Sequence, residues 1–72
     1  MIVTYYIEKD PETGLYVGIA PGIPGAHTQA ESLDELRENL KEVVELCLQE
    51  FKPAKRKKFP EFVGIQQLEV RA

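Results

Sequence analysis

The chain has 72 residues, a formal net charge of −3 and a single cysteine. This length predicts one domain, and a domain so small buries only about 60% of its unfolded surface, so we expect oligomerisation to stabilise it. One cysteine excludes an intramolecular disulfide, and no apolar run approaches the roughly 20 residues that a membrane-spanning helix needs. The N-terminus lacks the features of a signal peptide, so the sequence predicts a soluble, cytoplasmic protein.

The first twenty residues are typical of a β-hairpin. Residues 2–8 and 15–20 are rich in β-branched and aromatic side chains, and Asp10, Pro11 and Gly14 between them favour a tight turn. Both strands alternate, and both faces carry apolar or aromatic side chains. The face that we expect a helix to cover consists of Val3, Tyr5, Ile7, Leu15, Val17 and Ile19.

A proline- and glycine-rich turn at residues 21–25 ends the second strand, and residues 26–30 are long enough for a short third strand. The only long helical pattern follows, from Ser32 to Phe51. Ser32 is well placed as N-cap, and Glu35 completes the capping-box pattern. The apolar stripe of this helix consists of Leu33, Leu36, Leu40, Val43, Val44, Cys47 and Phe51. Cys47 is therefore interpreted as a small buried hydrophobe.

After the helix, the charged and proline-containing residues 52–60 predict a loop, and residues 62–70 predict a last strand. Its alternation changes phase at Gln66 and Gln67, which suggests a bulge or an end of burial. The predicted fold is α+β, a two-layer β-β-β-α-β domain over residues 1–72 with one helix on one face of the sheet. We expect the strand order 3-2-1-4, with the last strand parallel to the first.

Charge is unevenly distributed along the chain. Between Glu31 and Glu50 there are seven acidic and two basic residues, so the helix exposes an acidic face that suits a basic protein partner. A cluster of cations follows the helix, and it is either a nucleic-acid contact or a solvated loop that protects a sheet edge. The cluster contains Lys52, Lys55, Arg56, Lys57 and Lys58.

The sequence offers little catalytic chemistry. His27 is the only histidine, and no further ligands stand at metal-binding spacing around it. Neither Ser32, interpreted as a cap, nor Cys47, interpreted as a core residue, is placed as its nucleophilic partner. We therefore predict a protein that is not an enzyme and that carries no metal or cofactor.

Two consecutive segments carry a family resemblance. Residues 21–30 read Pro-Gly-Ile-Pro-Gly-Ala-His-Thr-Gln-Ala, and residues 31–43 read Glu-Ser-Leu-Asp-Glu-Leu-Arg-Glu-Asn-Leu-Lys-Glu-Val. They resemble the HicB-like antitoxins, whose signature joins a P-x-L-P-G-C-x-T-x-G turn to a D-S/T-x-E-E-A-x-x-N-x-x-E-A helix after a hairpin. The positions that depart from this signature are Ile23, Ala26, Ala30, Leu36 and Val43.

The resemblance implies a partial ribonuclease H-like fold and an antitoxin that neutralises HicA, a small mRNA-cleaving ribonuclease toxin, by covering its active site. The expected docking residues are Glu38, Glu42 and Glu45 on the helix, or else the turn around His27. Many such antitoxins add a DNA-binding module, but this sequence runs only to Ala72, so we expect no direct DNA binding. The alternatives are a nucleic-acid-binding regulator that uses residues 52–58 and an orphan oligomer without a toxin.

We also expect a homodimer or a higher homo-oligomer. One helix covers one face of the sheet, so the opposite face would display an apolar patch of the kind that marks an interface. Leu46, which lies off the main helix stripe, would extend this contact. The other predicted interface residues are Ile2, Thr4, Tyr6 and Tyr16.

Overall fold

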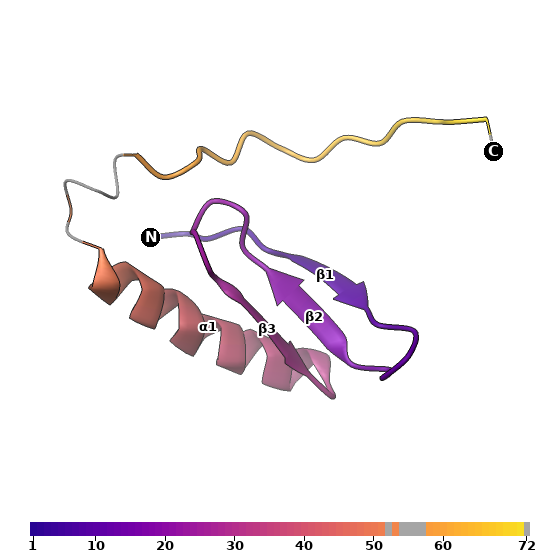
Figure 1. Cartoon of the computed structure of the whole chain (residues 1–72), viewed down its shortest axis with the longest axis horizontal. Helices are drawn as coiled ribbons and strands as arrows, with labels where there is room; N and C mark the ends of the chain where they lie inside the picture. Colours follow the sequence, from indigo (N-terminus) through magenta and orange to yellow (C-terminus); the bar gives the residue numbers. More distant parts are fainter. Residues whose placement is uncertain (52, 54–57, 72) are drawn as a thin grey trace.

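A computed structural model of the chain describes residues 1–51, 53 and 58–71, and this part contains three strands followed by one helix (Figure 1). The strands β1 (Tyr6–Lys9), β2 (Tyr16–Ile19) and β3 (His27–Ala30) form one antiparallel sheet in the order β1-β2-β3. The helix α1 (Leu33–Glu50) packs against one face of this sheet, mainly over β3 and β2. The predicted two-layer α+β architecture is confirmed in this coarse form.

The β1–β2 hairpin is closed by the predicted turn. The backbone N–H of Gly14 donates to the Asp10 carbonyl at 2.8 Å, and the Asp10 carboxylate accepts from the backbone N–H of Glu12 at 2.9 Å. Gly14 has a φ of 74°, a left-handed conformation that a residue with a side chain rarely adopts. The turn residues therefore fix where β2 begins.

The register of the hairpin corrects the predicted face of β2. Ile7 pairs with Gly18, and residues directly opposite one another lie on the same face, so Tyr16, Gly18 and Ala20 share the face of Ile7. A Cβ atom added to Gly18 would lie 3.3 Å from three side-chain atoms of Leu36, which places Gly18 under the helix. The prediction that Leu15, Val17 and Ile19 lie on the helix-covered face was wrong.

Small residues let the helix approach the sheet closely. Ala20 and Ala30 are buried beneath α1, as is Gly18, while the bulkier Val17 and Ile19 lie on the other face and are half-buried. In the segment that leads into β1, Val3 and Tyr5 pack against the core as predicted. The core cluster of buried residues consists of Ala20, Ile23, Ala26, Leu40 and Val44.

The proline-glycine turn closes on itself and places Ile23 in the core. The N–H of Ala20 donates to the Ala26 carbonyl at 2.9 Å, and the N–H of Ile23 donates to the Ala20 carbonyl at 3.1 Å. Gly25 has a φ of 80°, which allows the chain to reverse toward β3. The turn therefore closes one end of the core with the side chain of Ile23.

The helix begins where the sequence predicts. The Ser32 hydroxyl accepts from the backbone N–H of Glu35 at 3.2 Å, and Asp34 and Glu35 place negative charge in the first turn. Leu36, Leu40 and Val44 are its buried residues, which confirms the centre of the apolar stripe. Leu33 is 51% exposed, so its predicted place in the stripe was wrong.

The segment after the helix is anchored near the core and then leaves it. Phe59 packs against the core cluster and contacts Phe51 edge-to-face, with ring centroids 4.9 Å apart. Residues 61–71 then run as an extended, exposed segment on the β1 side of the molecule (Figure 1). The predicted fourth strand at 62–70 and the order 3-2-1-4 are not confirmed, because this segment pairs with no strand of the described residues.

Candidate functional site

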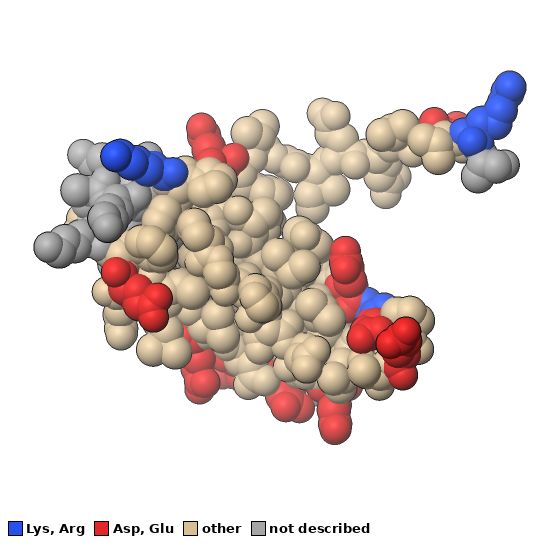
Figure 2. Space-filling view, viewed as in Figure 1, with Lys and Arg blue, Asp and Glu red and all other residues tan. Residues whose placement is uncertain are grey.

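The outer surface of α1 is acidic. Glu38, Glu42 and Glu45 are all exposed, and acidic side chains follow the helix side of the molecule in Figure 2. No helix in the described ranges is both long and apolar enough to cross a bilayer. The helix therefore presents one charged surface to solvent and one apolar surface to the sheet.

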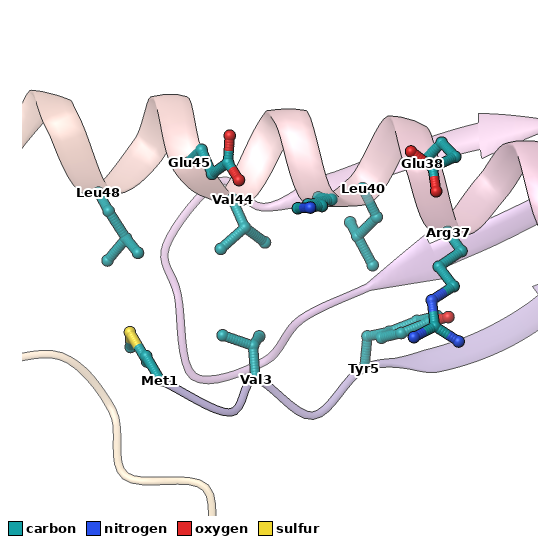
Figure 3. A pocket seen from close by; sticks show the side chains of 10 residues that line it. Met1, Val3, Tyr5, Arg37, Glu38, Leu40, Val44, Glu45 and Leu48 are labelled. Carbon is teal, nitrogen blue, oxygen red and sulfur yellow. The ribbon is translucent and has the colours of Figure 1, made fainter.

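A groove lies beside this helix because α1 covers β2 and β3 more than the chain that leads into β1. The groove is open, has a volume of about 730 Å³, and lies between the helix and residues 1–5 (Figure 3). Its apolar lining consists of Met1, Val3, Tyr5, Leu40, Val44 and Leu48. Its charged lining consists of Arg37, Glu38, Lys41 and Glu45.

The side chains in Figure 3 show how the groove is arranged. Val3 points toward the helix while Leu40 and Val44 point toward the strand side, so apolar groups converge on the floor. Arg37 extends toward Tyr5 at one end, and Leu48 lies near Met1 at the other. An apolar floor with a charged rim is the arrangement of a protein-binding surface, in which buried apolar groups anchor and charges orient the partner.

The structure brings together some of the predicted docking residues and separates others. Glu38 and Glu45 both line the groove, whereas Glu42 is exposed outside it. His27 is exposed on β3 and pairs with Ile19, which places it on the sheet face that α1 does not cover. His27 and the three glutamates therefore cannot form one site.

The described residues contain no group of three or more His, Cys, Asp or Glu side chains that could hold a metal ion. His27 is exposed on the face opposite the helix that carries Ser32 and Cys47. Lys52, Lys55, Arg56 and Lys57 lie outside the described residues, so the nucleic-acid contact stays a prediction; Lys58 is exposed.

The predicted oligomer interface is divided by the register of the sheet. Tyr6 lies on the face that α1 leaves open, but Tyr16 lies on the helix side, where Lys9 Nζ is 5.4 Å from its ring centroid. The placement of Tyr16 on the open face was therefore wrong. Ile2, Thr4 and Leu46 are exposed.

A second groove was missed by reasoning from the sequence. It has a volume of about 710 Å³ and lies between β1 and the extended C-terminal segment. Its lining residues are Tyr6, Ile7, Glu8, Pro21 and residues 60–66. The signal that could have pointed to it is the phase change at Gln66 and Gln67, which indicates a segment without one continuous buried face.

Comparison with known proteins gives three related chains. The chain is 48% identical over 69 residues to a UPF0150 protein of Thermotoga maritima, and the aligned region covers 96% of this chain and 89% of the relative. It is 51% identical over 65 residues to a UPF0150 protein of Archaeoglobus fulgidus, covering 90% and 88%. It is 42% identical over 64 residues to a UPF0150 protein of Synechocystis, covering 89% and 87%. No family model and no solved structure matches the chain.

Proposed function

We propose, from the premise that the chain belongs to the UPF0150 family, that it is an antitoxin-like binding protein. Its partner is a HicA-type ribonuclease toxin, whose active site it covers. The sequence support is the resemblance of residues 21–43 to the turn and helix of HicB-like antitoxins. This segment supplies the buried turn around Ile23 and the part of the exposed acidic surface of α1 that carries Glu38 and Glu42.

The observation that carries this proposal is the juxtaposition of the acidic helix surface with the apolar groove. A protein that binds and cleaves RNA needs a basic active-site surface, because it must hold phosphates. The acidic surface of α1, with Glu38, Glu42 and Glu45, has the complementary charge, which speeds association and orients the partner. The groove floor at Val3 and Val44 then offers an apolar anchor point beside it.

A finer description of the fold belongs to the same proposal. In a partial ribonuclease H-like fold, a strand formed by residues 62–70, from the same chain or from a second copy, would lie beside β1 and give the order 3-2-1-4. Two observations support this arrangement. β1 is an edge strand of the described sheet, and residues 61–66 line the groove beside it.

The test uses a HicA-type toxin as the binding partner. Glu42→Lys combined with Glu45→Lys should lower its association rate at low salt by about tenfold, because the steering charge is reversed. The difference should shrink at high salt as screening increases. The matched control is Glu8→Lys with Glu12→Lys, an equal charge change at exposed positions of the hairpin.

Two outcomes contradict the proposal. If the HicA-type toxin neither binds this chain nor loses RNA cleavage in its presence, the antitoxin function is wrong. If the helix and hairpin variants slow association equally, the effect is one of net charge, and the helix is not the docking surface.

A further inference from the structure

The C-terminal segment exposes apolar side chains to water, which does not stabilise a single chain. Residues 61–71, called the arm below, are all exposed, and Val63 reaches 92%. The other large aliphatic side chains of the arm are Ile65, Leu68 and Val70. These residue types favour strands because they pack on a pleated surface, and exposed apolar segments of this kind mark interaction sites.

The first residues of the arm are held against the rest of the molecule, called the body below. Phe59 packs on the core, and a Cβ added to Gly22 would lie 3.5 Å from the Pro60 carbonyl oxygen and 3.7 Å from Phe62 Cβ. The arm therefore leaves the molecule at a defined place beside the proline-glycine turn. Its direction follows from this anchor and from the extended conformation of the chain.

The arm and β1 leave an open groove between them. Tyr6, Ile7 and Glu8 line one side of this groove, and residues 60–66 line the other. The two segments run in the same direction in Figure 1. In the part of the chain that the structure describes, β1 pairs with β2 alone, so its outer edge is available to a further strand.

The sequence of the arm is complementary to itself when two arms lie antiparallel. With Gln66 opposite Gln66 of the second copy, Glu61 faces Arg71 of the second copy at both ends. The same register places Phe62 opposite Val70 and Gly64 opposite Leu68, so this face of the arm pair is apolar on both sides of the central Gln66 pair. Opposite charges and apolar pairs directly across a ladder are the combinations that stabilise a sheet.

We propose that two copies of this chain exchange their arms around a two-fold axis perpendicular to the sheet. Each arm enters the groove of the other copy and lies between that copy's β1 and its arm. The axis reverses the direction of the second arm, so every neighbouring pair of strands is antiparallel. The result is one continuous eight-stranded sheet, in which the fourth strand beside β1 belongs to the second copy.

Pairing within one chain is less favourable on two counts. The arm runs parallel to its own β1, and parallel pairing is slightly weaker per residue than antiparallel pairing. It would also leave the outer edge of the arm unpaired, because no further strand of the described residues lies beyond it. The exchange pairs both edges of each arm. It does not depend on toxin binding.

The first experiment is light scattering on the full chain at micromolar concentration. The exchange predicts a dimer of about twice the chain mass of 8.2 kDa. Ile65→Asp should weaken dimerisation by at least about tenfold, because it places a carboxylate in the paired arm. Leu33→Asp, at an exposed position in the first turn of α1, should leave the dimer intact. A monomeric wild-type chain, or equal effects of the two variants, would overturn the proposal.

The second experiment tests the exchange itself. In a Cys47→Ser background, Gln66→Cys should form a disulfide-linked dimer under mild oxidation, because the two sulfurs meet at the axis. Gln49→Cys, an exposed control on α1, should stay monomeric on a denaturing gel. Arg71→Glu should weaken the dimer, and combining it with Glu61→Arg should restore it. Equal cross-linking at positions 66 and 49 would exclude arm exchange, whether or not the toxin proposal holds.

Discussion

Residues 6–50 and residues 61–71 are both rich in aliphatic side chains, but only the first set packs them within its own chain. In the first set, Leu40 is 2% exposed beneath a helix that starts at a hydrogen-bonded cap. In the second, Val63 is 92% exposed although its neighbours are typical of a strand. Strand-forming residues specify a strand only when a neighbouring strand or helix is within reach, whereas a helix satisfies its own backbone.

The largest expected effect on the packed region comes from Leu40→Ala. Removing this side chain opens a cavity in the core cluster and should lower the free energy of unfolding by about 2–5 kcal/mol. Leu46→Ala, at a position that is 59% exposed, should change it by less than about 0.5 kcal/mol. Urea denaturation measures both, and similar losses would mean that the buried face of α1 is assigned wrongly.

The next effect tests the register of the hairpin. Gly18→Val should lower the free energy of unfolding by about 1–3 kcal/mol, because the new side chain meets Leu36 under the helix. Gly64→Val is the matched control in the arm, where no heavy atom of the described residues lies within 4 Å of the added Cβ. Thermal unfolding compares the two, and a stabilised Gly18 variant would place this glycine on the open face instead.

A smaller effect comes from the helix cap. Ser32→Ala removes the acceptor for the Glu35 N–H and should cost about 1 kcal/mol in the free energy of unfolding. Ser32→Asp retains an acceptor at the same position and should recover most of that loss. If Ser32→Asp unfolds as easily as Ser32→Ala, the hydroxyl does not cap this helix.

The smallest effect is expected at the edge strand. Lys9→Gln removes the ammonium that lies 5.4 Å from the Tyr16 ring centroid and should lower the free energy of unfolding by about 0.5 kcal/mol. Lys58→Gln makes the same chemical change at an exposed position after the helix. Chemical denaturation of both variants decides whether the loss is specific to the contact with Tyr16.

The elements whose geometry is set locally could be predicted from the sequence. Gly14 and Ser32 act through neighbouring residues, and the structure places the turn and the cap where these residues predict them. The face of β2 could not be decided in this way, because both of its faces are apolar. The loop of residues 10–15 pairs Lys9 with Tyr16 and so joins odd-numbered to even-numbered residues.

Part of the candidate site could likewise be predicted from local sequence, and part of it could not. Glu38 and Glu45 lie seven residues apart, so the helical period brings them to one side of α1 and onto the groove. The separation of His27 from these glutamates depends on which face of β3 it occupies, and that is a property of the whole sheet. The groove beside the arm depends on the path of residues 58–71 in space, which no local pattern specifies.

The order of the elements along the chain has a consequence for folding. β1, β2, β3 and α1 follow one another, and each strand pairs with the strand next to it in the sequence. Contacts of short sequence separation form quickly, so the body can fold early without help from the arm. The arm is synthesised after the body, and its pairing requires an encounter between two chains. Folding should therefore show a fast step that is independent of concentration, followed by a slower step whose rate rises with protein concentration.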